Sequence, residues 1–247
     1  MPRLCWFAPM SPEETPTYNP RMHRGGKLSF RSRVPEGDDD PGEFLVMGGM
    51  DPPPLSELVP ADTPVEIEIG PGKGVFVLAA TEARPDTFLL GIEAAPGYAS
   101  LAALKLRKSG RTNGRVLVDN GKIYLQDRVP DEALDAVHVY FPDPWPKRRH
   151  KGRRFFTDDV TAVLARVLRD HGFCYVATDN AAYAGQVARV LGSAQDFARD
   201  EERETSAPAL GPGHAFTPTS FERKYLEQGR VIRRYAFRRL PRGRSAR

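Results

Sequence analysis

The sequence lacks most of what disulfide-stabilised, zinc-binding and membrane-spanning proteins require. Its 247 residues include only two cysteines, Cys5 and Cys174, which lie far apart and form no Cys-x-x-Cys pair. Neither a disulfide framework nor a metal site is therefore expected. No run of about 18 apolar residues is present, as a membrane span would require. Prolines interrupt the N-terminal region, which lacks the apolar stretch of a secretory signal. We expect a cytoplasmic protein without metal or membrane association.

The excess of positive over negative charge is also small for the whole chain, but it is large in one segment. The formal net charge is only +4, while 40% of the residues are hydrophobic, enough to bury a core. Between Arg223 and Arg247, however, ten Lys or Arg residues face a single acid, Glu227. Because clustered basic charge is what an anionic partner would meet, this distribution favours a nucleic-acid partner.

The N-terminal region differs in composition from the rest. Of the 23 prolines, 11 fall within the first 60 residues, together with the acidic run Glu36–Asp40. Such a stretch buries too little apolar surface to offset its ordering entropy. We predict a disordered tail over residues 1–45, with an irregular docked arm as the alternative. A catalytic domain over residues 46–240 and a basic tail over residues 241–247 would follow.

Short apolar runs alternate with helical patterns from Val65 onward. The predicted buried strands are Val65–Ile69, Phe88–Ile92, Val116–Val118, Ala136–Phe141 and Cys174–Thr178. The predicted helices are Gly74–Ala83, Tyr98–Lys108, Asp158–Leu168 and Ala181–Leu191. A final strand over Val231–Leu240 follows a short helix near Phe221–Gln228. This alternation predicts one α/β domain with a mostly parallel sheet covered on both faces.

A glycine-rich loop connects the first predicted strand to its helix. Gly70 and Gly72 belong to a G-x-G-x-G loop that follows Glu68. Glycines let the backbone turn tightly and let a ligand approach it closely. Glu93 ends the second strand, 21 residues after Gly72, where a carboxylate can accept hydrogen bonds from ribose hydroxyls.

The carboxylates before the loop separate two possible cofactors. The dinucleotide motif is G-x-G-x-x-G, and a carboxylate at Glu68 would repel a pyrophosphate but suits a ligand that carries an ammonium and a sulfonium. S-adenosylmethionine is therefore favoured over NAD. Glu66 shares the strand face of Glu68 and is interpreted as an ordinary edge charge.

A proline-stiffened turn follows the fourth strand. Three prolines in five residues fix the backbone of Phe141–Lys147 at the sheet edge where ligands of α/β proteins bind. Asp143 can accept hydrogen bonds from N1–H and the N2 amino group of guanine, and Trp145 can stack on a base or sugar. The alternative is a stiff surface turn with a core tryptophan.

A basic cluster comes directly after this turn. Six of eight residues are basic, and His150 lies among them: Lys147, Arg148, Arg149, Lys151, Arg153 and Arg154. Such a run is often a solvated face, but its place beside the turn favours contacts with RNA phosphates.

With these residues in view, the chain resembles the bacterial tRNA (guanine-N7-)-methyltransferase family over roughly residues 45–240. The most specific segments are Pro142–Lys147 with the basic cluster behind it, and Thr219–Lys224. The resemblance implies a Rossmann-like class I methyltransferase fold with seven strands, the last one inserted antiparallel. It implies methyl transfer from S-adenosylmethionine to N7 of a guanine in the tRNA variable loop, expected at guanine 46, by a monomer or homodimer.

The resemblance also implies roles for individual residues. Asp143 lies at the reaction centre, for base recognition and charge stabilisation. The cofactor is held by Glu68, Gly70, Gly72, Glu93, Asn120 and Asp143. The substrate is contacted by Lys147, Asp179, Thr219, Ser220, Phe221 and Glu222. One position departs from the family, which usually has Asp where this chain has Asn120. An amide oxygen can still accept from the adenine amino group, but it lacks the charge. Asp179 is also interpreted as an N-cap of the helix from Ala181.

Two other functions stay open from the sequence. One is a different class I methyltransferase, which would act on other RNA, adenine N6 or a small molecule. The other is a non-catalytic RNA-binding protein with this fold, which the intact glycine loop with Glu68 and Glu93 disfavours.

Overall fold

The computed structural model describes residues 40–145, 147–205 and 225–243 of the chain. The predicted disordered tail lies outside these residues as far as position 39. Residues Gly42–Phe44 form a 3-10 turn (η3), and strand β1 begins at Leu45. No helix among the described residues is long and apolar enough to cross a membrane.

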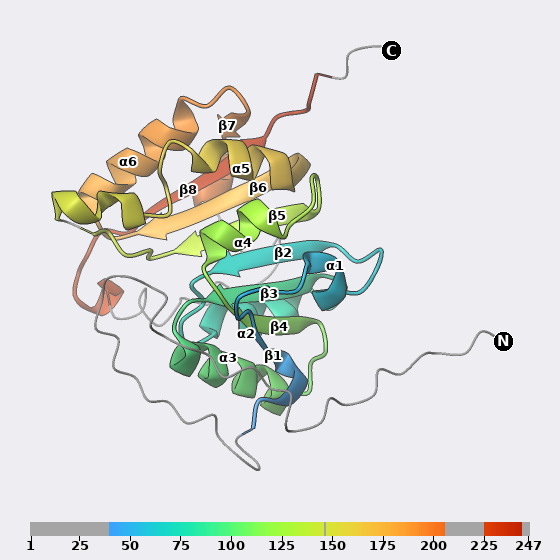
Figure 1. The fold of residues 1–247 in the computed structure, drawn as a ribbon. Helices are drawn as coiled ribbons and strands as arrows, with labels where there is room; N and C mark the ends of the chain where they lie inside the picture. Colours follow the sequence, from blue (N-terminus) through green and yellow to red (C-terminus); the bar gives the residue numbers. More distant parts are fainter. Residues whose placement is uncertain (1–39, 146, 206–224, 244–247) are drawn as a thin grey trace. The chain divides into compact units, whose positions relative to one another are not determined.

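One sheet of eight strands forms the centre of the domain, in the order β1-β4-β3-β2-β5-β6-β8-β7 (Figure 1). Strand β8 pairs antiparallel with β6 and β7, and the other pairs are parallel. The strands are β1 Leu45–Met47, β2 Val65–Ile69, β3 Phe88–Glu93, β4 Gly114–Val118, β5 Leu134–Tyr140, β6 Leu168–Thr178, β7 Phe197–Arg199 and β8 Arg233–Arg239. The final strand is thus inserted antiparallel, as the class I methyltransferase fold requires.

The predicted count of seven strands is wrong, because β1 adds an eighth. Leu45 pairs with Val116 of β4, so β1 extends the sheet beyond the strand that would otherwise be its edge. A three-residue strand carries too little alternation to be recognised from sequence. Strand β7 is equally short and was missed for the same reason.

Helices cover both faces of the sheet, as predicted (Figure 1). The described helices are α1 Leu55–Leu58, α2 Val75–Ala83, α3 Pro96–Ser109, α4 Gly121–Asp127, α5 Val160–Val167, α6 Ala181–Gly192 and α7 Glu201–Thr205, with a 3-10 helix, η4, over Arg148–Arg153. Helices α2 and α3 pack on one face with Leu89 and Val116. Helices α4, α5 and α6 pack on the other with Val137 and Val139.

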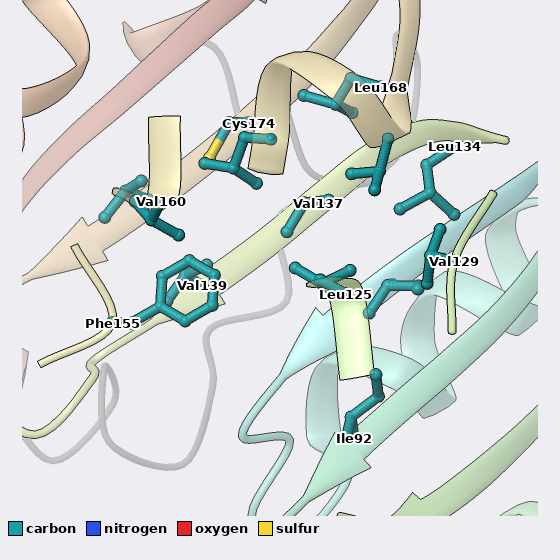
Figure 2. Packing of buried hydrophobic residues seen from close by; sticks show 14 of the residues in the cluster. Ile92, Leu125, Val129, Leu134, Val137, Val139, Phe155, Val160, Leu168 and Cys174 are labelled. Atoms are coloured by element: carbon teal, nitrogen blue, oxygen red, sulfur yellow. The ribbon is translucent and has the colours of Figure 1, made fainter. Parts of the chain in front are cut away.

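The larger core encloses β5, the strand that leads into the predicted catalytic turn. Figure 2 shows Val137 and Val139 of β5 among Leu125, Val160 and Cys174. Full burial raises the pKa of the Cys174 thiol well above its usual range, so this cysteine acts as a small core residue. Because β2, β3, β5 and β6 are parallel, their carboxyl ends share one edge of the sheet, where the candidate site lies.

Candidate functional site

The glycine loop leaves room for a ligand. Gly70 and Gly72 have positive φ angles of 72° and 53°, and a Cβ at either position would meet nothing within 4 Å. By contrast, a Cβ on Gly74 would lie 2.7 Å from the Cβ of Ala102. The first two glycines therefore shape an open backbone surface, whereas the third lets α2 approach α3 closely.

Glu68 is a buried carboxylate at the start of this loop. Its side chain is 3% exposed and accepts a hydrogen bond from the backbone of Val77, in the first turn of α2. Its Oε2 has no hydrogen-bond partner among the residues that the structure describes. Burial and the negative charge of Glu93 raise the pKa of Glu68 to about 8. A buried acceptor without a donor suits a positively charged ligand.

Glu93 ties the glycine loop to the end of β3. Its Oε2 accepts from the backbone N–H of Gly72 at 3.0 Å and its Oε1 from that of Ala95 at 2.9 Å. Burial raises the pKa of Glu93, and the negative charge of Asp143 raises it further. The backbone hydrogen bonds to its carboxylate lower the pKa but only partly offset this rise. Glu93 thus lies close enough to Glu68 on one side and to Asp143 on the other for their charges to act on each other, at the carboxyl ends of β2, β3 and β5.

Asn120 is the N-cap of α4, a role that sequence reasoning missed. Its amide oxygen accepts from the backbone N–H groups of Lys122 and Ile123, at 3.1 and 3.3 Å. This cap explains why a helix begins at Gly121, although the seven residues of α4 are too few to show a clear helical period in the sequence. The predicted contact with the adenine amino group stays a prediction.

We predict that Asn120→Asp leaves the fold intact and tightens cofactor binding. Aspartate caps helices as well as asparagine does, and a charged acceptor makes hydrogen bonds roughly twice as strong. Calorimetric titration of both proteins with the cofactor checks this. A large loss of affinity in a protein of unchanged melting temperature would show that Asn120 faces something other than the adenine.

The turn after β5 carries Asp143 in an exposed position between two strained residues. Phe141 and Trp145 have φ angles of 50° and 39°, which non-glycine residues rarely adopt. The backbone N–H of Phe141 donates to the carbonyl of Ala177 in β6 at 2.7 Å. Trp145 is half-buried and lies edge-on to His150, with the ring centroids 5.6 Å apart.

Asp179 follows β6 at the same edge, as predicted, but it is not the N-cap of α6. The capping oxygen belongs to Asn180, which accepts from the N–H of Tyr183 at 2.9 Å. Asp179 instead pairs with Arg230, whose Nη1 lies 2.7 Å from its Oδ2. That arginine stacks on Tyr225 at 4.6 Å. The four predicted substrate residues Thr219, Ser220, Phe221 and Glu222 lie outside the described residues.

The basic cluster divides into exposed and buried members. Lys147, Arg149 and Arg153 are exposed, and the Arg153 guanidinium lies 5.1 Å from the centre of the Trp145 ring. The side chains of Arg148 and Lys151 are not among those that the structure describes. Arg154 is only 8% exposed and donates through Nη2 to the carbonyl of Trp145 at 3.2 Å.

Local desolvation lowers the pKa of His150, and the neighbouring cations Arg153, Arg149 and Lys147 lower it further. Positive charge therefore gathers beside the turn that carries Asp143. This surface matches the chemistry of a phosphate-binding face.

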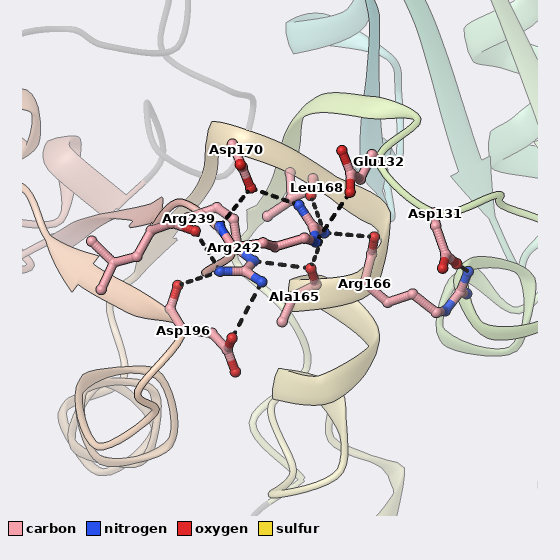
Figure 3. A network of polar contacts seen from close by, with 10 residues as sticks. Asp131, Glu132, Ala165, Arg166, Leu168, Asp170, Asp196, Arg239 and Arg242 are labelled. Carbon is pink, nitrogen blue, oxygen red and sulfur yellow. Dashed lines mark hydrogen bonds and ion pairs between the residues drawn. The ribbon is translucent and has the colours of Figure 1, made fainter. Parts of the chain in front are cut away.

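The C-terminal arginines are partly structural. Figure 3 shows Arg239 and Arg242 converging on the connection between α5 and β6. Arg239 is 5% exposed and donates through Nε to the carbonyl of Ala165 at 2.9 Å. Arg242 contacts Asp170 through Nη1 at 2.8 Å. These two side chains hold β8 and the chain after it in place, which leaves fewer C-terminal arginines for RNA.

A buried polar network behind the site was also missed. Glu66 is no edge charge: its Oε2 accepts from Arg84 at 2.6 Å and from Nε2 of His138 at 2.8 Å. Burial lowers the pKa of His138, so the neutral ring accepts the hydroxyl of Tyr140 at Nδ1, 2.9 Å away. Tyr140 directly precedes the turn that carries Asp143. Period-2 alternation placed Glu66 on one strand face with Glu68, but it cannot show that the neighbouring strand β5 brings His138 to Glu66.

Comparisons with known proteins identify the family to which the chain belongs. A family model described as "Putative methyltransferase" matches residues 62–235. The tRNA (guanine-N(7)-)-methyltransferase of Nitrosomonas europaea is 33% identical over 190 residues, which cover 76% of this chain and 82% of that protein. The enzyme of the same name from Streptomyces avermitilis is 37% identical, with 75% of this chain and 63% of that protein covered. The crystal structure of an aminoglycoside resistance methyltransferase is similar at 22% identity and a TM-score of 0.45, covering 72% of this chain and 87% of that one. The chain belongs to the tRNA (guanine-N7-)-methyltransferase family.

Proposed function

We propose that this protein transfers a methyl group from S-adenosylmethionine to N7 of a guanine in the variable loop of tRNA, expected at guanine 46. The observation that carries the proposal is that Glu68, Glu93 and Asp143 lie at or just after the carboxyl ends of the neighbouring parallel strands β2, β3 and β5, beside a surface of exposed cations. Family membership supplies the reaction class.

The residues at this edge fit the proposed cofactor. S-adenosylmethionine supplies a sulfonium-activated methyl group when bound. The unpartnered Oε2 of Glu68 would offer buried negative charge to its cationic end once that cation has ionised the carboxyl group, and the open backbone at Gly70 and Gly72 leaves space beside it. Glu93 ends β3 with a carboxylate that would turn from the loop N–H groups towards ribose hydroxyls.

The proposed reaction depends mainly on the alignment of the guanine N7 with the methyl group of the cofactor. N7 of guanine carries an in-plane lone pair and needs no deprotonation before attack, so positioning can supply roughly 7–11 kcal/mol of barrier reduction. Asp143 would accept the N1–H and N2 amino hydrogens of the base and favour the positive charge that develops on the ring. No covalent nucleophile is required.

Incubation with unmodified tRNA and labelled S-adenosylmethionine, followed by nucleoside analysis, tests the proposal. We expect 7-methylguanosine in the variable loop. Methylated adenine would point instead to an amino-group methyltransferase, and cofactor binding without product would favour the non-catalytic alternative. We further propose that the protein acts in the cytoplasm as a monomer or homodimer.

Binding of tRNA is expected to weaken steeply with salt. Each phosphate contact contributes about 0.7–0.9 to the slope of log affinity against log salt. Arg149 is exposed beside the turn, so Arg149→Gln should lower the slope by about that amount for every tRNA. The methylated guanine should stay the same. Equal slopes for variant and wild type in a salt titration would mean that Arg149 is only a solvated charge.

A further inference from the structure

We propose that Arg154 is a positioning residue, whose buried guanidinium holds the Phe141–Trp145 turn in the conformation that presents Asp143 to the base. The inference rests on the proposed function, since it takes Asp143 to meet the guanine. It gives Arg154 a different role from the phosphate contact predicted from the sequence.

The turn needs to be held at both ends. Phe141 and Trp145, which bracket Asp143, both have positive φ angles. Non-glycine residues persist in this conformation only when the surrounding structure fixes them. At the first end, the N–H of Phe141 donates to the carbonyl of Ala177 in β6. A sheet partner of this kind is not available at the second end, because the chain there has left the sheet.

Arg154 supplies the restraint at the second end. Its Nη2 donates to the carbonyl of Trp145 at 3.2 Å, nine residues earlier in the chain. With only 8% of the residue exposed, the guanidinium offers little surface to a phosphate. Arg149 in the same basic run is exposed, so the two arginines have the same charge but different surroundings.

The other half of the guanidinium is fixed to helix α6. Nη1 donates to Oε1 of Gln186, and the guanidinium carbon lies 5.3 Å from the centre of the Tyr183 ring. Gln186 in turn donates through Nε2 to the carbonyl of Phe156. Arginine therefore bridges the turn to a rigid helix through its planar fork, a geometry that lysine cannot reproduce.

The decisive experiment compares Arg154→Met with Arg149→Gln in steady-state methylation of tRNA. Arg154→Met is expected to lower kcat by about 10- to 100-fold, the cost of misplacing a reacting group by about 1 Å. Cofactor affinity and the salt slope of tRNA binding should stay as in wild type. Arg149→Gln should change the slope instead. Arg189→Gln, an exposed arginine of α6 that pairs with Asp158, is the matched control and should behave as wild type.

Gln186→Met tests the same bridge without touching the basic run. We expect a loss of kcat in the same range as for Arg154→Met, and the double variant should lose little more than either single one, since both break one connection. If Arg154→Met fails to fold, Gln186→Met and Arg154→Lys carry the test. Additive losses would overturn the inference, because they would show that Arg154 and Gln186 act independently. A flatter salt slope with normal kcat for Arg154→Met would also overturn it and would show that Arg154 contacts a phosphate.

Fluorescence separates this inference from the proposed function. The chain has two tryptophans, so in a Trp6→Phe background the emission reports Trp145 alone. Arg154→Met should make Trp145 more accessible to acrylamide, whereas Arg189→Gln should not. Unchanged quenching would refute the positioning role even if 7-methylguanosine is made. Absence of 7-methylguanosine from wild type would refute the proposed function but leave this measurement valid.

Discussion

Replacing Asp143 by alanine is expected to lower methyl transfer to tRNA by about 100-fold or more, the usual effect of removing one preorganised electrostatic contact at a reaction centre. Asp143 is exposed at the tip of a turn that is anchored on β6. Its charge acts on Glu93, one of the proposed cofactor-binding residues. Cofactor affinity should change only a few-fold, because Glu68 and Glu93 stay in place.

The measurements are single-turnover methylation at saturating tRNA and calorimetric binding of the cofactor. Asp131→Ala is a suitable control, because this exposed carboxylate precedes β5, at the opposite edge of the sheet, and pairs with Arg166. Asp131→Ala should retain wild-type turnover. Near-normal turnover of folded Asp143→Ala protein would show that Asp143 does not lie at the reaction centre.

The parallel core of the fold could be predicted because its strands are short segments rich in Val, Ile and Leu that alternate with helical patterns. Strand β2 has the predicted bounds Val65–Ile69, and β8 forms within the predicted segment and runs antiparallel. The elements that were missed are short or depend on one contact. Helix α4 is only seven residues long and is set by the Asn120 cap, and β1 exists because β4 offers it an edge.

For the candidate site, the sequence likewise predicted where residues lie along the chain but not what surrounds them in the structure. Motif spacing correctly brought the loop of Gly72, the carboxylate of Glu93 and the turn of Asp143 to one sheet edge. Motif spacing could not predict burial. Arg149 and Arg154 belong to the same basic run in the sequence, but Arg149 is exposed in the structure and Arg154 is buried. Nor could motif spacing distinguish Asp179 from Asn180 as the cap of α6, because both are good capping residues.

Replacing Glu68 by glutamine is expected to weaken cofactor binding by about 30-fold or more, since truncating one partner of a buried charge pair costs about 2–5 kcal/mol. The substitution keeps the size of the side chain, and the amide oxygen can still accept from the backbone of Val77. What is lost is the buried negative charge that would face the cationic end of the cofactor.

The same carboxylate should make cofactor binding depend on pH in wild type. Burial and Glu93 raise the pKa of Glu68 from 4.5 to about 8 in the free protein, so the side chain is mostly protonated at pH 7. A cationic ligand favours the ionised form and lowers this pKa, and binding below pH 8 therefore releases a proton. Affinity should rise as the pH increases from 6 to about 8 and then level off, because above the free pKa no proton remains to be released.

Calorimetry in buffers of different ionisation enthalpy measures the proton released on binding. We expect release near pH 7 in wild type and a much smaller release in Glu68→Gln, whose affinity should vary little between pH 6 and 8. The raised pKa of Glu93 gives a background that both proteins share. A pH profile that is the same in both would show that Glu68 stays protonated in the complex, and that the cation of the cofactor is balanced by another group.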